Sequence, residues 1–235
     1  MNSAPGVTAG FTSENSVIEL GLKFTMAYML GSVLGSLVVG HLRGGIDIRT
    51  IGSGNAGGTN ALRTQGKAFA FFVMLIDIGK GILAVLLIPA LDLPLIGYDA
   101  SVDRDLLYYS VAFAAIIGHV YPLWFDFRGG KGGATAAGLL FVIAPTIAPA
   151  IILIWVAVVF FTGFVGLATM SATVAATAIF AWLHLPDGHD LVLFSASVSA
   201  LIIFTHRGNI ARMIAGTESR MRRGRRNSGN HESRS

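Results

Sequence analysis

The sequence predicts an all-α, polytopic integral membrane protein with about seven transmembrane helical segments. Of its 235 residues, 53% are hydrophobic and only 13% are charged, whereas a soluble domain carries about 25% charged residues. The mean hydropathy is +0.67. The apolar residues form long runs without amphipathic periodicity, so the surroundings of the helices must themselves be apolar. We expect one membrane domain over 17–216, between a flexible tail at 1–16 and a basic cytoplasmic tail at 217–235.

Six apolar runs account for the expected helices, since a membrane span needs about 20 residues. The runs cover 17–39, 68–91, 106–125, 134–161, 167–185 and 191–205. The fourth run contains Pro145 and Pro149, and two prolines four residues apart break the interior of a helix. We therefore predict a tight pair of short helices in this run, which brings the total to seven.

Charges beside the runs predict the orientation. The loop after the first run carries Arg43, Arg49, Arg63 and Lys67, and the loop after the second is rich in aspartate, with Asp92, Asp99, Asp103 and Asp105. By the positive-inside rule the first loop is cytoplasmic and the N-terminus is outside. The arginine-rich tail should also be cytoplasmic, and it carries Arg220, Arg222, Arg223, Arg225 and Arg226. The polar stretches then share the cytoplasmic face, and they cover 42–67, 126–133, 162–168 and 206–235.

The composition excludes several classes of site. The chain has no cysteine, so disulfides and thiolate metal sites are impossible, and we expect neither a metal nor a cofactor. The first sixteen residues lack the lysine or arginine that opens a secretory signal. The arginine-rich tail is typical of a solvated segment or of one that lies on anionic lipid headgroups, and nothing aromatic or folded accompanies it to support nucleic-acid binding.

The first polar stretch contains the pattern G-x-G-x-x-G at Gly52, Gly54 and Gly57. This pattern indicates dinucleotide binding only after a strand, and here it lies between membrane helices, so we reject that interpretation. Glycines still allow backbone N–H groups to converge on an anion. Neutral donors and a cation suited to phosphate follow, namely Ser53, Thr59, Asn60 and Arg63. The alternative is a flexible loop with a lipid-facing arginine.

The second polar stretch surrounds Lys131 with glycines, at Gly129, Gly130, Gly132 and Gly133. It does not match the nucleotide-binding pattern G-x-x-x-x-G-K-[ST]. The first N–H groups of the helix that begins near Thr135 would join in anion binding. The alternative is that Lys131 only sets the topology. Two glycine-plus-cation loops on one face indicate two phosphates, or one phosphate bound from both sides.

The third polar stretch begins with His206 and Asn209, which share a helix face if the helix continues. Histidine serves as a base or a phosphate donor near neutral pH, and asparagine orients a hydroxyl. The alternative is a structural histidine at the membrane interface. We expect His119 and Tyr121 to cap or pack at a helix end.

Asp77 and Lys80 lie three residues apart in the middle of the second run. Charges inside a membrane are costly, so we expect an ion pair that supports the site. A path for a proton or a substrate is the alternative.

Together these stretches resemble the bacterial acyl-phosphate-dependent glycerol-3-phosphate acyltransferases of the PlsY type. The matching pieces, in chain order, are Gly52-Ser-Gly-Asn55, Thr59-Asn-Ala-Leu-Arg63, Asp77-Ile-Gly-Lys-Gly81, Gly129-Gly-Lys-Gly132, His206 with Asn209-Ile, and Gly216-Thr-Glu218. Each piece is weak alone, but their order in a multi-span chain is specific. The chain departs from the family pattern at Ala56, Gly58 and Gly133, and at 165–169, where Val-Gly-Leu-Ala-Thr replaces a serine-rich stretch.

The resemblance implies a seven-helix enzyme of the bacterial cytoplasmic (inner) membrane with its site facing the cytoplasm. Such an enzyme transfers a fatty acyl group from acyl phosphate to the first hydroxyl of glycerol 3-phosphate, giving lysophosphatidate and phosphate for phospholipid biosynthesis. It implies catalytic roles for Arg63, Lys131, His206 and Asn209. Residues expected to hold the substrates are Ser53, Gly54, Asn55, Thr59, Asn60, Arg63, Gly129, Gly130, Lys131, Gly132, Thr169 and His206.

The residues present favour direct, single-displacement transfer, because attack on an activated acyl phosphate needs positioning more than activation. No histidine begins the H-x-x-x-x-D pattern of coenzyme-A-dependent acyltransferases, and the chain has no cysteine nucleophile. The base stays open between His206 and the substrate's own phosphate. The main rival is an organophosphate transporter, but we find no internal repeat, and the motifs gather on one face. Membrane lipids are the other expected partners, with the chain a monomer or weak homo-oligomer.

Overall fold

The computed structural model describes residues 13–93 and 102–221, which form helices and loops without a β-strand. The helices are α1 (Ser13–Gly31), α2 (Gly35–Leu42), η1 (Ile48–Thr50), α3 (Gly58–Gln65), α4 (Lys67–Leu87), α5 (Arg104–Val120), η2 (Leu123–Phe125), α6 (Gly133–Ile143), α7 (Ala148–Thr162), α8 (Val165–His184), α9 (His189–Thr205) and α10 (Arg207–Ile214). The all-helical expectation is confirmed for the described residues.

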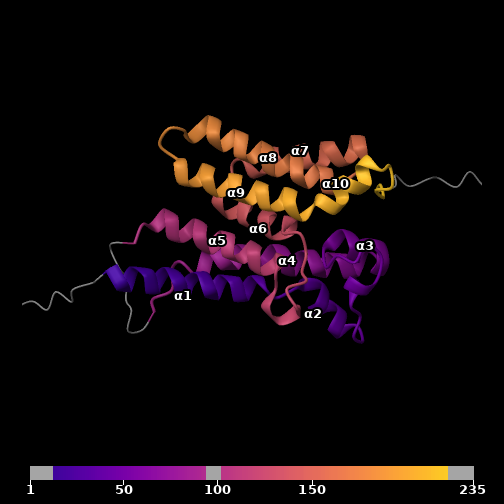
Figure 1. Cartoon of the computed structure of the whole chain (residues 1–235), viewed down its shortest axis with the longest axis horizontal. Coiled ribbons are helices and arrows are strands. Elements are labelled where there is room, and N and C mark those ends of the chain that lie inside the picture. Colours follow the sequence, from indigo (N-terminus) through magenta and orange to yellow (C-terminus); the bar gives the residue numbers. More distant parts are fainter. Residues whose placement is uncertain (1–12, 94–101, 222–235) are drawn as a thin grey trace, which may run out of the picture.

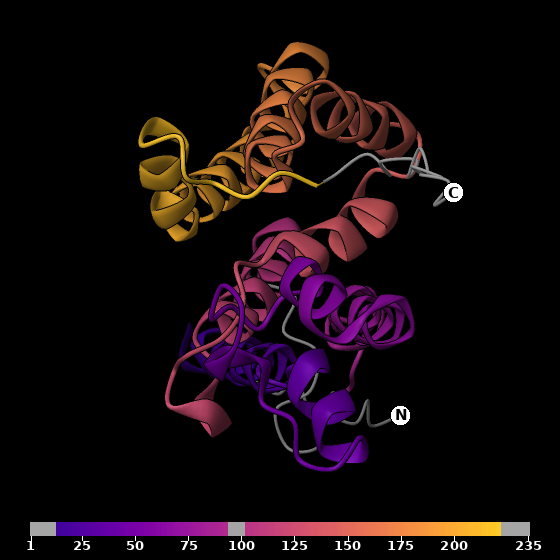
Figure 2. The same ribbon diagram turned by 90° about the vertical axis from the view of Figure 1, so that its right-hand side faces the viewer.

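The helices form two layers with α6 between them (Figures 1 and 2). One layer holds α1 to α5 and the other holds α7 to α10. Helix α5 packs on α1, α4 and α9, and α4 packs on α6. The layers therefore meet along α5, α6 and α9. Helices α2, α3 and α10 lie at the same end of the molecule (Figure 1), so the structure gathers the polar stretches at one end.

The described helices include three that are long and apolar enough to cross a membrane: α4, the segment Arg104–Phe125, and α8. The number rises to five if each bent pair counts as one span, namely α1 with α2 and α9 with α10. Large apolar side chains face outward, and Phe161 and Trp182 are 82% and 86% exposed. Such surfaces are stable only against lipid.

The proline-containing run is a pair of short helices, as predicted. Helix α6 ends at Ile143, and α7 begins at Ala148 with a proline in its first turn. Proline fixes its own φ and lacks an N–H donor, so it is tolerated where a helix begins and not inside one. The two helices then have different neighbours, because α6 packs on α4 and α7 packs on α8.

The first apolar run is not one continuous helix, contrary to the simplest expectation. It breaks between α1 and α2, with a bend of 44°. Lys80 Nζ donates to the Val33 carbonyl at 2.7 Å, and the Gly35 N–H donates to Asp77 Oδ1 at 3.1 Å. A helix break at membrane depth needs such partners because no water is present to satisfy the backbone.

Close backbone contact joins α1 to α5. A Cβ on Gly31 would lie 2.2 Å from the Ala115 carbonyl oxygen, and one on Gly118 would lie 2.1 Å from that of Tyr28. Small residues let membrane helices approach in this way. The contact fixes the end of α5, from which the second polar loop departs.

The tails fall largely outside the described residues. Residues 1–12 of the N-terminal tail and 222–235 of the basic tail, which hold five of the six arginines of that tail, cannot be compared with the expectation. Arg220 is described, and its guanidinium lies over the Phe164 ring at 4.9 Å. The Met221 N–H donates to the Gly163 carbonyl at 2.8 Å. The chain just after α10 therefore folds back onto the loop between α7 and α8.

Candidate active site

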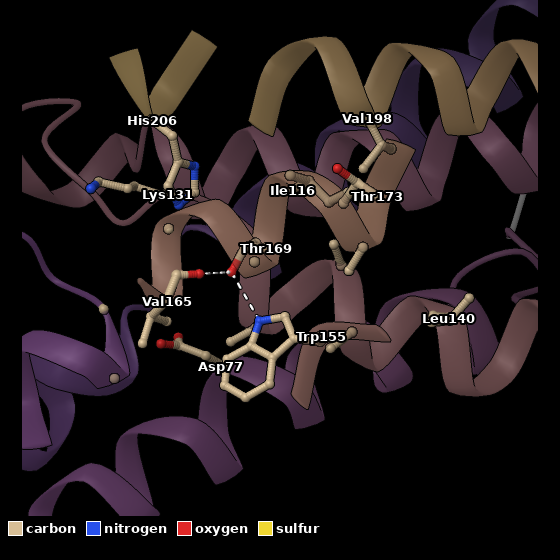
Figure 3. Close-up of a pocket in the computed structure, with 18 of the residues that line it drawn as sticks. Asp77, Ile116, Lys131, Leu140, Trp155, Val165, Thr169, Thr173, Val198 and His206 are labelled. Atoms are coloured by element: carbon tan, nitrogen blue, oxygen red, sulfur yellow. Dashed lines mark hydrogen bonds between the residues drawn. The ribbon is translucent and has the colours of Figure 1, made fainter. Parts of the chain in front are cut away.

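One cavity of about 390 Å³ collects polar residues from both layers. The expected site residues that line it are Ser53, Asn55, Thr59, Asn60, Arg63, Lys131, Thr169, His206 and Asn209. Figure 3 shows Lys131 and His206 together at one end, with Leu140 and Val198 toward the other. Residues far apart in the sequence therefore meet around one space.

Asn60 organises the first polar loop. It is 2% exposed, and its amide nitrogen donates to the carbonyls of Ile48, Ile51 and Asn55 at 2.9, 3.1 and 3.0 Å. Its Oδ1 accepts from the Ser53 N–H at 2.9 Å. Because both ends of the amide are used within the loop, Asn60 positions the loop, and its contact with a substrate phosphate stays a prediction.

The N-terminus of α3 opens into the cavity. Gly57 is its N-cap residue and provides no side-chain hydrogen bond to the first turn. Gly58 and Thr59 follow in that turn, and Arg63 lies one turn later; all line the cavity. The N-terminus of a helix attracts anions through its N–H groups and its dipole. Gly58 lies close to Met74, since a Cβ at this position would be 2.4 Å from Met74 Sδ and would require that side chain to move.

The glycines of the second polar loop serve a different purpose from the one expected. The N–H groups of Gly129 and Gly130 donate to the carbonyls of Val120 and His119 at 3.1 and 3.0 Å. A Cβ on Gly130 would lie 2.0 Å from His119 Nε2. Gly132 has φ +86° and turns the chain into α6. These three glycines do not line the cavity, so the structure does not bring their backbone into the site, and the loop presents Lys131 there.

Lys131 is the first residue in a series of hydrogen bonds that continues through Asn209 and Glu218. Its Nζ donates to Asn209 Oδ1. Asn209 Nδ2 donates to Glu218 Oε1 at 2.9 Å, and Arg212 Nε donates to Glu218 Oε2 at 2.6 Å. Burial lowers the pKa of Lys131 to about 8, with the Arg212 cation acting in the same direction and Glu218 opposing both. The ammonium is thus partly desolvated and ready to bind an anion.

His206 sits at the bend of 54° between α9 and α10. Its Nδ1 is 2.7 Å from the Ile202 carbonyl oxygen. A carbonyl accepts only from a protonated nitrogen, which assigns the proton to Nδ1 and leaves Nε2 as the acceptor in the neutral ring. A Cβ on Gly166 would lie 3.2 Å from both the His206 ring and the Asn209 amide. The glycine therefore lets α8 approach both side chains.

The expected ion pair between Asp77 and Lys80 is confirmed, and His119 joins it. Lys80 Nζ is 3.1 Å from Asp77 Oδ1 and 2.8 Å from His119 Nδ1. All three side chains are at most 3% exposed. Because Gly130 packs on the His119 ring, the cluster links the break in the first run to the loop that carries Lys131. Asp77 and His119 also line the cavity, and Asp77 Oδ2 is buried without a hydrogen-bond partner.

Two further expectations change. Gly54 does not line the cavity; it has φ +71° and donates its N–H to the Ile51 carbonyl at 3.1 Å. Thr169 lines the cavity, but its hydroxyl donates to the Val165 carbonyl at 3.0 Å and accepts from Trp155 Nε1 at 3.1 Å. Sequence reasoning missed Trp155, because a tryptophan within an apolar run carries no signal of a site.

Beyond Thr169 most of the residues that line the cavity are apolar. Its walls there include Leu140, Ile151, Ala172, Ala176, Phe180 and Phe194. A cationic end and an apolar end in one space match a molecule with a phosphate at one end and a hydrocarbon chain at the other. The fold and the site therefore define a helical membrane protein whose cavity has a cationic end and an apolar end.

The comparisons with known proteins agree with this class. The family described as glycerol-3-phosphate acyltransferase matches residues 22–216. The chain is 37% identical to the glycerol-3-phosphate acyltransferase of Chlorobaculum parvum, over 86% of this chain and 96% of the relative. It is 38% identical to that of Aquifex aeolicus, over 83% of this chain and 95% of the relative. The chain therefore belongs to the glycerol-3-phosphate acyltransferase family, whose members are acyltransferases of phospholipid biosynthesis.

Solved structures show the same relationship. The chain is similar to two crystal structures of PlsY, described as an integral membrane glycerol 3-phosphate acyltransferase. The glycerol 3-phosphate form has a TM-score of 0.72 and the lysophosphatidic acid form one of 0.71. Each is 31% identical, and the match covers 86% of this chain and 94% of the other. The PlsY-type family suggested by the motifs is thereby confirmed.

Proposed function

We propose that this protein transfers a fatty acyl group from acyl phosphate to the 1-hydroxyl of glycerol 3-phosphate. The products are lysophosphatidate and inorganic phosphate. The observation that carries this proposal is the single cavity in which Arg63, Lys131 and His206 meet an apolar compartment. PlsY structures with glycerol 3-phosphate and with lysophosphatidic acid support the substrate and the product.

The cationic end binds phosphoryl groups. Arg63 with the N-terminus of α3 approaches from one layer and Lys131 from the second loop, and His206 presents the acceptor Nε2 at the same end of the cavity. Ser53 and Thr59 add neutral donors, and Asn209 lies at the glycerol end, where its amide already holds Lys131. Groups fixed in this way orient the hydroxyl and stabilise the oxyanion of the tetrahedral intermediate.

The reaction is a direct displacement. The substrate hydroxyl oxygen forms a bond to the acyl carbon, and the bond from that carbon to the phosphate oxygen breaks. The hydroxyl proton passes to a base, and phosphate leaves with the electron pair of the broken bond. The chain has no cysteine to form an acyl-enzyme, which supports transfer directly from the donor to the acceptor through one tetrahedral intermediate.

Two groups compete as the base: His206, through Nε2, and the phosphate of the substrate. His206→Gln keeps a side-chain donor but removes the basic nitrogen. We expect the variant to lose at least a hundredfold in kcat if the histidine is the base, which is the usual contribution of a general base. Retained activity with an unchanged pH profile would assign the proton to the substrate phosphate.

The function is tested with purified protein in detergent. Labelled glycerol 3-phosphate is supplied with acyl phosphate or with acyl-CoA, and lysophosphatidate and phosphate are measured. We expect product from acyl phosphate alone. Product from acyl-CoA alone would contradict the proposal that acyl phosphate is the donor. Uptake of glycerol 3-phosphate into vesicles without any product would favour a transporter.

The proposed topology is seven spans in the bacterial inner membrane, with the N-terminus outside and the site facing the cytoplasm. The chain has no cysteine, so the labelling of one introduced cysteine reports the side of the membrane on which that position lies. Lys67→Cys and Asp187→Cys lie at opposite ends of the helices and can be labelled with an impermeant maleimide in spheroplasts, in which the outer face of the inner membrane is open to the reagent. We expect labelling at position 187 in these intact cells and at position 67 only after lysis. The reverse pattern would contradict the orientation.

A further inference from the structure

The cavity continues from its cationic end into a compartment with mostly apolar walls, where the hydroxyls of Thr173 and Ser195 donate to carbonyls of their own helices. We call the space bounded by Leu140, Ile151, Ala172, Ala176, Phe180 and Phe194 the apolar compartment. Its residues come from α6, α7, α8 and α9. Under the proposed function this compartment receives the hydrocarbon chain of the acyl donor, and the inference below rests on that function.

The length of the compartment follows from α8, which runs along it. Thr169 marks the polar end, where it accepts the hydrogen bond from Trp155 at 3.1 Å. Phe180 marks the far end, about 17 Å further along a helix that rises 1.5 Å per residue. Half of a hydrocarbon core of about 30 Å is about 15 Å. The compartment therefore has the length of one layer of long membrane acyl chains.

Phe180 closes the far end from the side of α8. It is 3% exposed and packs in one cluster with Ala144, Ile151 and Ala176. Ala144 belongs to the turn between α6 and α7, so Phe180 and that turn are parts of one buried cluster. Because buried side chains are close-packed, a hydrocarbon chain that reaches this ring must displace it to extend further.

Phe194 closes the same end from the side of α9. Its ring stacks on Tyr109 of α5, with centroids 5.2 Å apart and an interplanar angle of 20°. The hydroxyls of Thr177 and Ser199 lie 3.0 Å apart and fix the register of α8 against α9. In that register Phe180 and Phe194 lie at a similar level. Two rings anchored on different neighbours form a rigid floor.

We infer that Phe180 and Phe194 form the floor of the acyl-chain compartment and set the longest acyl chain that the enzyme accepts. Ala176 lies about one turn nearer the cationic end on the same helix and is 8% exposed. Its small side chain leaves open the last part of the compartment. A larger residue there would shorten the compartment without touching the floor.

The expected chain-length profile is asymmetric. Each methylene that enters the compartment adds about fourfold to binding, so kcat/KM rises with chain length until the chain reaches the floor. One carbon unit beyond that point must displace a packed ring, which costs more than the burial gains. Activity should then fall steeply.

The test measures kcat/KM for a series of saturated acyl phosphates, from dodecanoyl to eicosanoyl, with Phe180→Ala, Phe194→Ala and Ala176→Leu. We expect Phe180→Ala to move the optimum to longer chains. The ratio of kcat/KM for a chain longer than the wild-type optimum to kcat/KM at that optimum should rise about tenfold over the wild-type ratio. Phe194→Ala should move it in the same direction. Ala176→Leu should move it to shorter chains.

Trp182→Ala is the matched control, because Trp182 lies on α8 but is 86% exposed on its outer side. It should leave the profile unchanged. The KM for glycerol 3-phosphate should stay the same in all variants, which separates a change in the compartment from damage to the phosphate site. Ala176→Leu keeps the inference testable if either phenylalanine variant fails to fold.

An unchanged optimum in Ala176→Leu and in the folded phenylalanine variants would overturn the inference, as would a uniform loss at every chain length. Failure of the proposed donor looks different. If the wild-type protein used acyl-CoA and not acyl phosphate, the donor proposal would fall, and the same series made with acyl-CoA would still show whether the floor sets the chain length.

Discussion

The two glycine-rich loops look alike in sequence but work differently. In the first, Asn60 gathers the backbone and α3 opens its N-terminus into the cavity, so the loop offers backbone donors together with Arg63. In the second, the N–H groups of Gly129 and Gly130 are bonded within the protein. Its glycines allow close packing on His119, and the loop contributes one side chain, Lys131. Glycine content alone therefore does not show whether a loop binds an anion through its backbone.

The largest expected effect comes from the side chain that the second loop presents. Lys131→Met should lower kcat/KM by about a thousandfold, because one charge-stabilising donor in an enzyme site contributes a factor of about 10² to 10³ and the change also disturbs Asn209. The assay is lysophosphatidate formation. Lys67→Met is the matched control, an exposed lysine outside the cavity. Similar losses in both would contradict the role of Lys131.

A smaller effect separates close packing from backbone binding. Gly130→Ala keeps its N–H but places a Cβ 2.0 Å from His119 Nε2. The shifted loop should misplace Lys131, and a displacement of about 1 Å can cost a hundredfold in rate. Gly79→Ala is the control, because a Cβ there meets nothing within 4 Å. Normal activity and thermal stability in Gly130→Ala would contradict this account of the second loop.

Asn60→Asp tests the hydrogen bonds by which the Asn60 amide holds the first loop. The carboxylate has the same shape but removes the amide donors that hold three carbonyl groups. Each such hydrogen bond contributes about 1 kcal/mol, and we expect the KM for glycerol 3-phosphate to rise about tenfold through loosening of α3. Gln65→Glu makes the equivalent change on the same helix outside the cavity. An unaltered KM in Asn60→Asp would show that the loop holds its shape without the amide.

The smallest effect is a pH dependence of substrate binding. Lys131 binds phosphate in its charged form, and its pKa is lowered from 10.5 to about 8. The charge is complete well below pH 8 and is lost as the pH rises, so the apparent affinity for glycerol 3-phosphate should fall about twofold between pH 7 and pH 8. Lys131→Arg keeps its charge over this range and should remove the dependence. The same pH profile in both proteins would assign the titration to another group.

Much of this arrangement could be predicted from the sequence. Apolar runs gave the helices, Pro145 and Pro149 located the turn between α6 and α7, and the spacing of Asp77 and Lys80 indicated their ion pair. These features depend on local rules that hold wherever the segment lies. The resemblance to the family indicated four catalytic residues, and the structure brings all four to one cavity: Arg63, Lys131, His206 and Asn209.

The remainder depends on contacts between distant segments. Nothing in the local sequence shows that the Gly130 N–H is already bonded to His119, or that Asn60 faces three carbonyl groups of its own loop. The break at 32–34 depends on Lys80 and Asp77 in another helix. Trp155 enters the site only because α7 turns back along α8. These roles arise from packing, so no single segment carries their signal.

The most direct test of the central claim is a double-mutant cycle on glycerol 3-phosphate binding, measured by calorimetry without an acyl donor. The proteins are the wild type, Arg63→Ala, Lys131→Met and the double variant. If the two loops hold one phosphoryl group between them, each single change should weaken binding about tenfold or more, and the two should be coupled by about 1 kcal/mol. Wild-type affinity in both single variants, or fully additive losses, would contradict the convergence of Arg63 and Lys131 on one bound phosphate.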